Sequence, residues 1–267
     1  MKKSVKTAIL AIMVLSLIMC MSAQVLAADE AVTVYVTISD GVLKTAQQPV
    51  KMTDTDGDGV LTVNDALYLA HEAEYPGGAA AGYASAEGDY GPAITSLWGV
   101  KSGSGYGYYI NNASAMSLAD TVKNGDYISA FVYTDTVAYS DTYCFFDKSA
   151  IESDSGEAFT LTLNAAAFDE NWQPVVKPAE GAVITVDGER TQYVTDSQGK
   201  VTMSLEGDKR CVISAVSDSQ VLVPAACIVT VSEKVPDTDA AASCVSLLIF
   251  VAAAVCASVA IGKKDEK

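Results

Sequence analysis

The chain has 267 residues, half of them hydrophobic, and a formal net charge of −16 at pH 7. This length suits one or two domains, and the apolar content is sufficient for a core. The acidic charge excludes nucleic-acid binding through phosphate neutralisation and suits divalent cations or basic partners, although simple solubility explains it equally well.

The first 27 residues are typical of a secretory signal peptide. Lys2, Lys3 and Lys6 form a basic start, residues 8–17 are apolar, and small residues lead to an expected cut after Ala27. We therefore expect the rest of the chain to lie outside the cytoplasm, in a compartment where disulfides can form.

Residues 54–65 have the spacing of a twelve-residue calcium loop. Carboxylates fall at positions 1, 3 and 5, and Gly59 stands at position 6, where such a loop turns sharply. The predicted ligands are Asp54, Asp56, Asp58, the carbonyl of Val60, a water held by Thr62, and Asp65 at position 12. We therefore predict Ca²⁺ as the cofactor.

An ordinary acidic surface turn is the alternative, because Asp, Gly and Thr are common turn residues. We favour calcium because the carboxylate spacing and the closing acid form a demanding pattern. An EF-hand has Glu at position 12, whereas Asp65 makes this loop similar to those of dockerins, which use Asp there. Dockerins carry two loops and this chain has one, so we do not predict a cohesin-binding role.

The segments on either side of the loop differ in periodicity. Residues 31–38 alternate between apolar and polar types, which predicts a strand. Residues 63–75 have apolar positions three and four apart and stop before Pro76, which predicts a helix. The lone His71 in this helix is expected to be a helix residue rather than a metal ligand, because zinc sites need companions.

Residues 77–105 are rich in glycine and are expected to form a flexible loop or several tight turns. Three motifs in and after this stretch are Trp-Gly at 98–99, Gly-Tyr-Tyr-Ile-Asn at 107–111 and Asn-Gly-Asp-Tyr-Ile at 124–128. Through these motifs, the region 28–148 resembles the small domain at the C-terminus of transcobalamin and intrinsic factor. The resemblance implies an α+β sheet domain that, in some members, forms half of a corrinoid site. A corrinoid-capturing surface protein is therefore the alternative function, although this sequence has no counterpart of transcobalamin's helical barrel.

A change of composition separates a second domain. Residues 149–177 are predicted to be a linker that contains a strand-like stretch at 158–163, and five alternating segments within 178–233 predict a β-sandwich. The motifs at 181–188 and 195–199 resemble prealbumin-like, carboxypeptidase-regulatory modules, which implies a non-catalytic surface domain.

Two cysteines of this second domain are candidates for a disulfide. Cys211 and Cys227 could close a loop of about fifteen residues, and such a bridge would add roughly 3 kcal/mol in the chain-entropy model. Two buried free thiols are the alternative, and the sequence leaves both open.

The C-terminal segment is typical of a membrane anchor. Residues 240–262 form an apolar run long enough to span a bilayer, and the basic tail at 263–267 is expected in the cytoplasm. Residues 235–239 resemble a Gram-positive cell-wall sorting signal at Pro236 and Thr238, but Asp239 replaces the glycine at the cut site. We therefore favour single-pass membrane anchoring over cell-wall attachment.

These patterns together predict a mainly β chain, with an α+β first domain, a β-sandwich second domain and a C-terminal transmembrane helix. No nucleophile pattern or fixed carboxylate pair is present, so we predict no enzymatic activity rather than a secreted hydrolase. The predicted function is a calcium-binding, membrane-anchored bacterial cell-surface protein that binds an unidentified extracellular ligand or protein.

Overall fold

The computed structural model describes residues 31–88, 91–101 and 105–233. Within these ranges the chain is mainly β, as predicted. No helix of the described residues is long and apolar enough to cross a membrane. The predicted signal peptide, the residues 235–239 that resemble a sorting signal, the predicted transmembrane segment at 240–262 and the tail at 263–267 lie outside the described residues.

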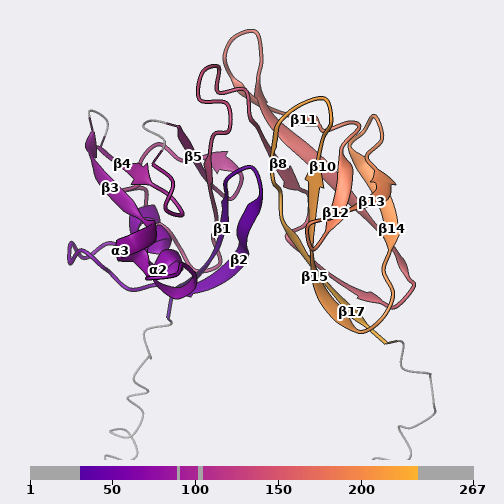
Figure 1. Cartoon of the computed structure of the whole chain (residues 1–267), viewed down its shortest axis with the longest axis horizontal. Helices are drawn as coiled ribbons and strands as arrows, with labels where there is room; N and C mark the ends of the chain where they lie inside the picture. Colours follow the sequence, from indigo (N-terminus) through magenta and orange to yellow (C-terminus); the bar gives the residue numbers. More distant parts are fainter. Residues whose placement is uncertain (1–30, 89–90, 102–104, 234–267) are drawn as a thin grey trace, which may run out of the picture.

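One five-stranded sheet organises the first domain (Figure 1). Its strand order is β2-β1-β7-β5-β6, and β1 runs parallel to β7 while the other neighbours are antiparallel. The strands are β1 (Thr33–Ser39), β2 (Leu43–Lys51), β5 (Tyr106–Ile110), β6 (Ala113–Ser114) and β7 (Tyr127–Val132).

Helix α2 (Val63–Glu74) covers one face of this sheet, and its bounds confirm the helix predicted over 63–75. Alternation in β1 turns Val34, Val36 and Ile38 toward the helix, where they join Leu67 in one fully buried cluster. The glycine-rich region after the helix is more ordered than expected. It contains α3 (Ala79–Gly82), β3 (Ala84–Gly88) and β4 (Gly91–Ser96), and the two strands form a hairpin.

The opposite face of the sheet turns toward the second domain. Phe131 on β7 is 1% exposed and packs in a small cluster with Tyr143 and Val223, which belong to the second domain. A Cβ on Gly107 would overlap the Phe131 ring, so a residue with a side chain would displace that ring. The domains therefore share a small aromatic core.

Two sheets packed face to face form the second domain, a β-sandwich. One has the order β11-β10-β8-β16 with β14 added beside β10, and the other has the order β13-β12-β15-β17-β9. The first sheet comprises β8 (Thr142–Phe146), β10 (Ala158–Phe168), β11 (Pro174–Pro178), β14 (Lys200–Ser204) and β16 (Leu222–Val223). The second comprises β9 (Ala150–Asp154), β12 (Val183–Val186), β13 (Glu189–Val194), β15 (Lys209–Val216) and β17 (Cys227–Ser232).

The predicted linker at 149–177 is wrong, because these residues form β9, β10 and most of β11. Leu161 and Leu163 on β10 are fully buried in the sandwich core, so the strand-like stretch at 158–163 belongs to the sandwich and not to a linker. Strand β8 also pairs with β10, so the sandwich begins near residue 142 and the first domain ends before the predicted 148.

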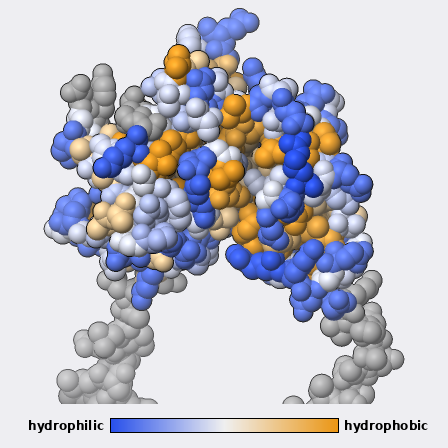
Figure 2. Space-filling model, in the orientation of Figure 1, coloured by the Kyte–Doolittle hydropathy of each residue, from blue (hydrophilic) through white to orange (hydrophobic). Residues whose placement is uncertain are grey.

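Hydrophobic residues gather along the junction of the domains on the face drawn in Figure 2. A hollow of about 420 Å³ lies there, lined by the β1–β2 turn and by strands of the sandwich, with Val42, Leu43, Val212 and Val216 among its apolar residues. The junction is therefore not completely filled by side chains.

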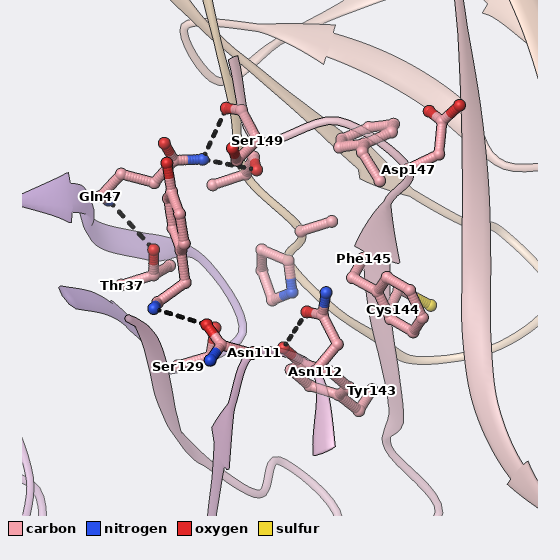
Figure 3. A pocket seen from close by; sticks show the side chains of 15 residues that line it. Thr37, Gln47, Asn111, Asn112, Ser129, Tyr143, Cys144, Phe145, Asp147 and Ser149 are labelled. Atoms are coloured by element: carbon pink, nitrogen blue, oxygen red, sulfur yellow. Dashed lines mark hydrogen bonds between the residues drawn. The ribbon is translucent and has the colours of Figure 1, made fainter. Parts of the chain in front are cut away.

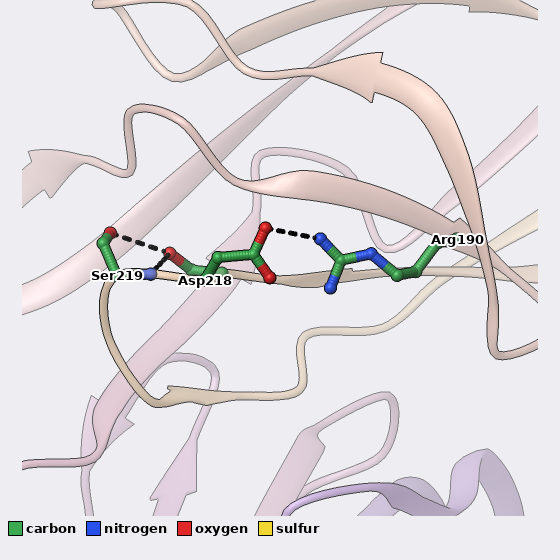
Figure 4. Close-up of polar contacts among 4 residues, drawn as sticks. Arg190, Asp218 and Ser219 are labelled. Carbon is green, nitrogen blue, oxygen red and sulfur yellow. Dashed lines mark hydrogen bonds and ion pairs between the residues drawn. The ribbon is translucent and has the colours of Figure 1, made fainter.

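An exposed ion pair joins the edge strand β13 to the loop after β15 (Figure 4). Arg190 Nη2 lies 2.8 Å from Asp218 Oδ2, and both side chains are largely exposed. Solvent screens such a pair, so it contributes little to stability.

The candidate disulfide between Cys211 and Cys227 is not formed, and both cysteines are free and buried. In the antiparallel pair of β15 and β17, Cys211 lies opposite Val229, whereas Cys227 lies opposite Ile213. The two cysteines are diagonal neighbours, whose side chains stand roughly 7–8 Å apart, too far for the roughly 3.5–4.5 Å that a disulfide requires.

We therefore expect every described cysteine to be a protected free thiol. Burial raises the pKa of Cys144 and of Cys227 to about 12, so little reactive thiolate forms at neutral pH. A thiol reagent applied to residues 28–239 without reductant should find no fast-reacting group in the folded protein and three after denaturation. A single reactive thiol after denaturation would instead establish the Cys211–Cys227 bridge.

Candidate metal site

The acidic loop joins β2 to α2 and brings three of the six predicted ligands together. Carboxylate oxygens of Asp54, Asp56 and Asp58 all lie within 4.8 Å of one another, and the three residues are exposed. Alternate residues of the loop thus present their carboxylates on one side, as the i, i+2, i+4 spacing predicts. This separation would allow one cation to contact all three groups.

The backbone of the loop holds Asp54 firmly. Gly59 N–H donates to its Oδ2 at 2.8 Å, and Gly57 N–H donates to its Oδ1 at 2.7 Å. Both bonds lower the pKa of Asp54, and the bond from Gly59 has the larger effect. Gly57 and Gly59 have φ angles of 80° and 86°, a conformation that suits glycine. The glycines therefore build the turn that fixes the first carboxylate in its charged form.

Asp56 has the opposite electrostatic balance. The bond from Asp58 N–H lowers its pKa, but desolvation and repulsion by the carboxylates of Asp58 and Asp65 together raise the pKa above its ordinary value. The net increase indicates that negative charge in this loop is crowded. A bound divalent cation would relieve that repulsion.

Asp65 is fully buried and lies outside the group of three. Its Oδ2 accepts bonds from Thr62 N–H at 3.0 Å and from the Thr62 hydroxyl at 2.8 Å. Thr62 is the N-cap of α2, and the two residues form a capping box. Asp65 Oδ1 accepts two further bonds, from Thr55 N–H at 2.8 Å and from the Thr55 hydroxyl. Both oxygens of the predicted closing ligand are thus engaged by the protein.

The other two predicted ligands contribute to the loop in different ways. Thr62 is buried and its hydroxyl is occupied in the capping box, so here it acts as a helix cap. Val60 is 40% exposed, and its N–H donates to Asp58 Oδ1 at 2.8 Å. Sequence reasoning missed Thr55, whose role depends on a bond to a residue ten positions away that no local pattern indicates.

His71 is buried beside the same helix and has both ring nitrogens engaged. Nδ1 donates to Leu67 O at 2.6 Å, and Nε2 accepts from Trp98 N–H at 3.0 Å. This arrangement requires a neutral ring protonated on Nδ1. His71 is therefore a structural residue that joins α2 to the segment around Trp98.

We expect the pKa of His71 to lie below its ordinary value of 6.5, because burial disfavours the charged ring. Its contribution to stability is then fully present above pH 6.5 and decreases as the pH falls from there through the folded-state pKa. The chain has one histidine, so a single imidazole C–H resonance reports the titration by NMR. A midpoint at or above 6.5 would contradict the described environment.

In the part of the chain that the structure describes, fold and site together define two domains that are mainly β, with an exposed acidic loop. No known protein family matches the chain, and no characterised protein sequence matches it significantly. The first four Ig domains of Dscam1 isoform 7.44 match at 14% identity with a TM-score of 0.23, over 56% of this chain and 36% of that one.

A second solved structure is the Bacteroides ovatus mixed-linkage glucan utilization locus protein SGBP-B, in complex with a mixed-linkage heptasaccharide. It matches at 12% identity with a TM-score of 0.20, over 59% of this chain and 40% of that one. The chain thus spans less than half the length of either structure. These distant likenesses carry no argument about function.

Proposed function

We propose that this protein is a calcium-stabilised, non-catalytic binding protein of the bacterial cell surface. The observation that supports the proposal is the group of three carboxylates, Asp54, Asp56 and Asp58, within 4.8 Å of one another. Hard cations such as calcium prefer carboxylate, carbonyl and water oxygens, which this loop can supply.

The ion would have a structural role. The acidic loop lies directly before α2, and α2 packs against the sheet through buried residues such as Leu67. A cation that contacts the three exposed carboxylates would replace their mutual repulsion with attraction and restrict the loop. Calcium should act better than magnesium, because magnesium dehydrates reluctantly and demands regular octahedral geometry.

The surface location rests on the predicted signal peptide and membrane anchor. In Figure 1 the described chain begins and ends on the same side of the molecule, while the β10–β11 hairpin lies at the opposite end. A membrane-anchored chain of this shape would present that hairpin and the domain junction away from its anchor. The binding role is proposed because the described domains are small β domains and because the sequence contains no nucleophile pattern or fixed carboxylate pair.

We expect millimolar calcium to stabilise the exported portion, residues 28–239. Extracellular calcium sites have a Kd of about 10⁻⁴–10⁻³ M. Calcium at about ten times Kd would therefore add roughly 1.4 kcal/mol to the free energy of unfolding. Thermal unfolding in calcium, in magnesium and in chelator measures the gain.

Matched substitutions localise the effect. Asp54→Asn combined with Asp58→Asn should abolish the gain, because two of the three clustered carboxylates are lost. Glu180→Gln removes an exposed acid outside the loop and should retain it. Identical melting curves in calcium and in chelator for the unsubstituted protein would refute the calcium proposal.

The corrinoid-capturing alternative stays a prediction. No observation on the described residues favours it over the calcium-stabilised binding protein. Absorption spectroscopy of the exported portion after incubation with cobalamin and gel filtration would test it directly.

A further inference from the structure

A polar cavity of about 220 Å³ lies between the two domains, on the sheet face opposite α2 (Figure 3). The first sheet contributes Thr37, Tyr127 and Ser129, and the sandwich contributes Tyr143 and Ser149. Because ligand pockets occur preferentially at domain interfaces, this place in the fold suits a binding site.

Gln47 crosses the junction and forms part of the wall. Strand β2 has one extra residue between its pairings Val36↔Gln48 and Ile38↔Thr45, so the strand bulges at Gln47, which has a φ angle of 49°. The bulge directs the side chain outward from the sheet, where Nε2 donates to Ser149 O at 2.8 Å and to Ala226 O at 2.9 Å. The amide is thereby fixed, and its Oε1 has no hydrogen-bond partner among the described residues.

Asn112 presents the complementary group. It lies in the turn between β5 and β6 with a φ angle of 66°. Its Oδ1 accepts the hydroxyl of Tyr143 at 3.0 Å, which orients the amide. The Nδ2 donor is left without a partner among the described residues, and Figure 3 shows it directed toward the middle of the cavity. The cavity therefore has a positioned donor, and the fixed amide of Gln47 forms part of its wall.

The charge of the lining selects the class of ligand. Its fifteen residues include no Lys, Arg or His, and one carboxylate, Asp147, whose Oδ1 already accepts Thr162 N–H. An anionic ligand would meet no cation here. Hydroxyl groups of Thr37, Ser129 and Ser149 add further groups that both donate and accept hydrogen bonds.

We infer that this cavity binds one ring of a neutral saccharide. A sugar ring carries hydroxyl groups that donate and accept at once, and it has apolar faces that suit a partly exposed ring such as Tyr127. The volume is below the roughly 300–1,000 Å³ of pockets for drug-sized ligands, which fits a single ring. The inference rests on the proposed binding role and names its ligand class.

Saturation-transfer NMR on the full-length chain in mild detergent tests the inference. The probes are glucose, galactose, mannose, xylose and N-acetylglucosamine, and inorganic phosphate is the anionic comparison. Asn112→Asp replaces the free donor with an acceptor, keeps the bond to Tyr143 and tolerates the same backbone conformation. For the sugar that binds, we expect Asn112→Asp to raise Kd about tenfold or more.

Asn171→Asp is the matched control, because Asn171 is exposed on the β10–β11 hairpin and does not line the cavity. It should leave the sugar Kd unchanged. The inference is overturned if none of the sugars binds, if Asn112→Asp binds the sugar as well as the unsubstituted chain, or if phosphate binds in place of sugars. Calcium stabilisation is also measured on this full-length chain, so failure of the saccharide site and failure of the calcium site are distinguishable.

Discussion

Replacing Asp65 with alanine is expected to destabilise the first domain by about 2–4 kcal/mol, with or without calcium. The substitution removes a buried carboxylate that accepts four hydrogen bonds from Thr55 and Thr62. It also destroys the capping box of α2 and leaves two backbone N–H groups without their partner. Urea unfolding in the presence of a chelator measures the loss.

Asp56→Ala is the matched control within the same loop. Asp56 is exposed, and its carboxylate accepts one long bond, from Asp58 N–H at 3.3 Å. Its raised pKa indicates crowding by neighbouring carboxylates, so its removal in chelator should leave stability unchanged or slightly increased. Calcium stabilisation should nevertheless be weakened. If Asp65→Ala were as stable as Asp56→Ala in chelator, the capping role of Asp65 would be wrong.

Replacing Phe131 with alanine is expected to cost about 3–5 kcal/mol, as for other buried phenylalanines. The ring is 1% exposed and lies 4.9 Å from the ring of Tyr133 and 6.1 Å from that of Tyr143, between ring centroids. Because Tyr143 belongs to the sandwich, the empty space left by the Phe131 ring would weaken the domain junction as well as the first sheet. We expect unfolding by urea, followed by tryptophan fluorescence and by far-UV circular dichroism, to separate into two transitions.

Phe168→Ala provides the comparison at an exposed position. Phe168 is 60% exposed at the end of β10, and its loss should change stability by about 0.5 kcal/mol or less. Equal effects of the two substitutions would contradict the buried position of Phe131. A single coincident transition for Phe131→Ala would show that the domains remain coupled without this ring.

Local patterns predicted the elements whose side chains alternate or recur at a helical period. Helix α2 was predicted within one residue, because its apolar spacing and Pro76 both act locally. Five of the six described strands after residue 182 were predicted for the same reason, and the two-residue strand β16 was not. Strand β10 was placed in a linker, although residues 158–163 were expected to be strand-like, because its pairing with β8, β11 and β14 depends on segments far along the chain.

The sequence likewise predicted one part of the acidic loop and missed another. The alternate spacing of Asp54, Asp56 and Asp58 is a local property, and these carboxylates do lie together. Asp65 was predicted from its position in the motif, but in the fold its oxygens are occupied by Thr55 and by the N-cap Thr62. Its spacing alone could not distinguish a ligand from a helix cap.

The sequence by itself determined that the described part of the chain is mainly β and acidic and that alternate carboxylates of one loop lie together, because charge, periodicity and turn residues act over a few positions. Only the tertiary structure decided that Cys211 and Cys227 stay unpaired, where the domain boundary lies, and that a cavity forms at Gln47 and Asn112. Cys211 and Cys227 are diagonal rather than opposite because of the strand register. Gln47 reaches Ser149 and Ala226 because a bulge turns it across the junction. Contacts of this kind join residues about a hundred or more positions apart, and no local pattern records them.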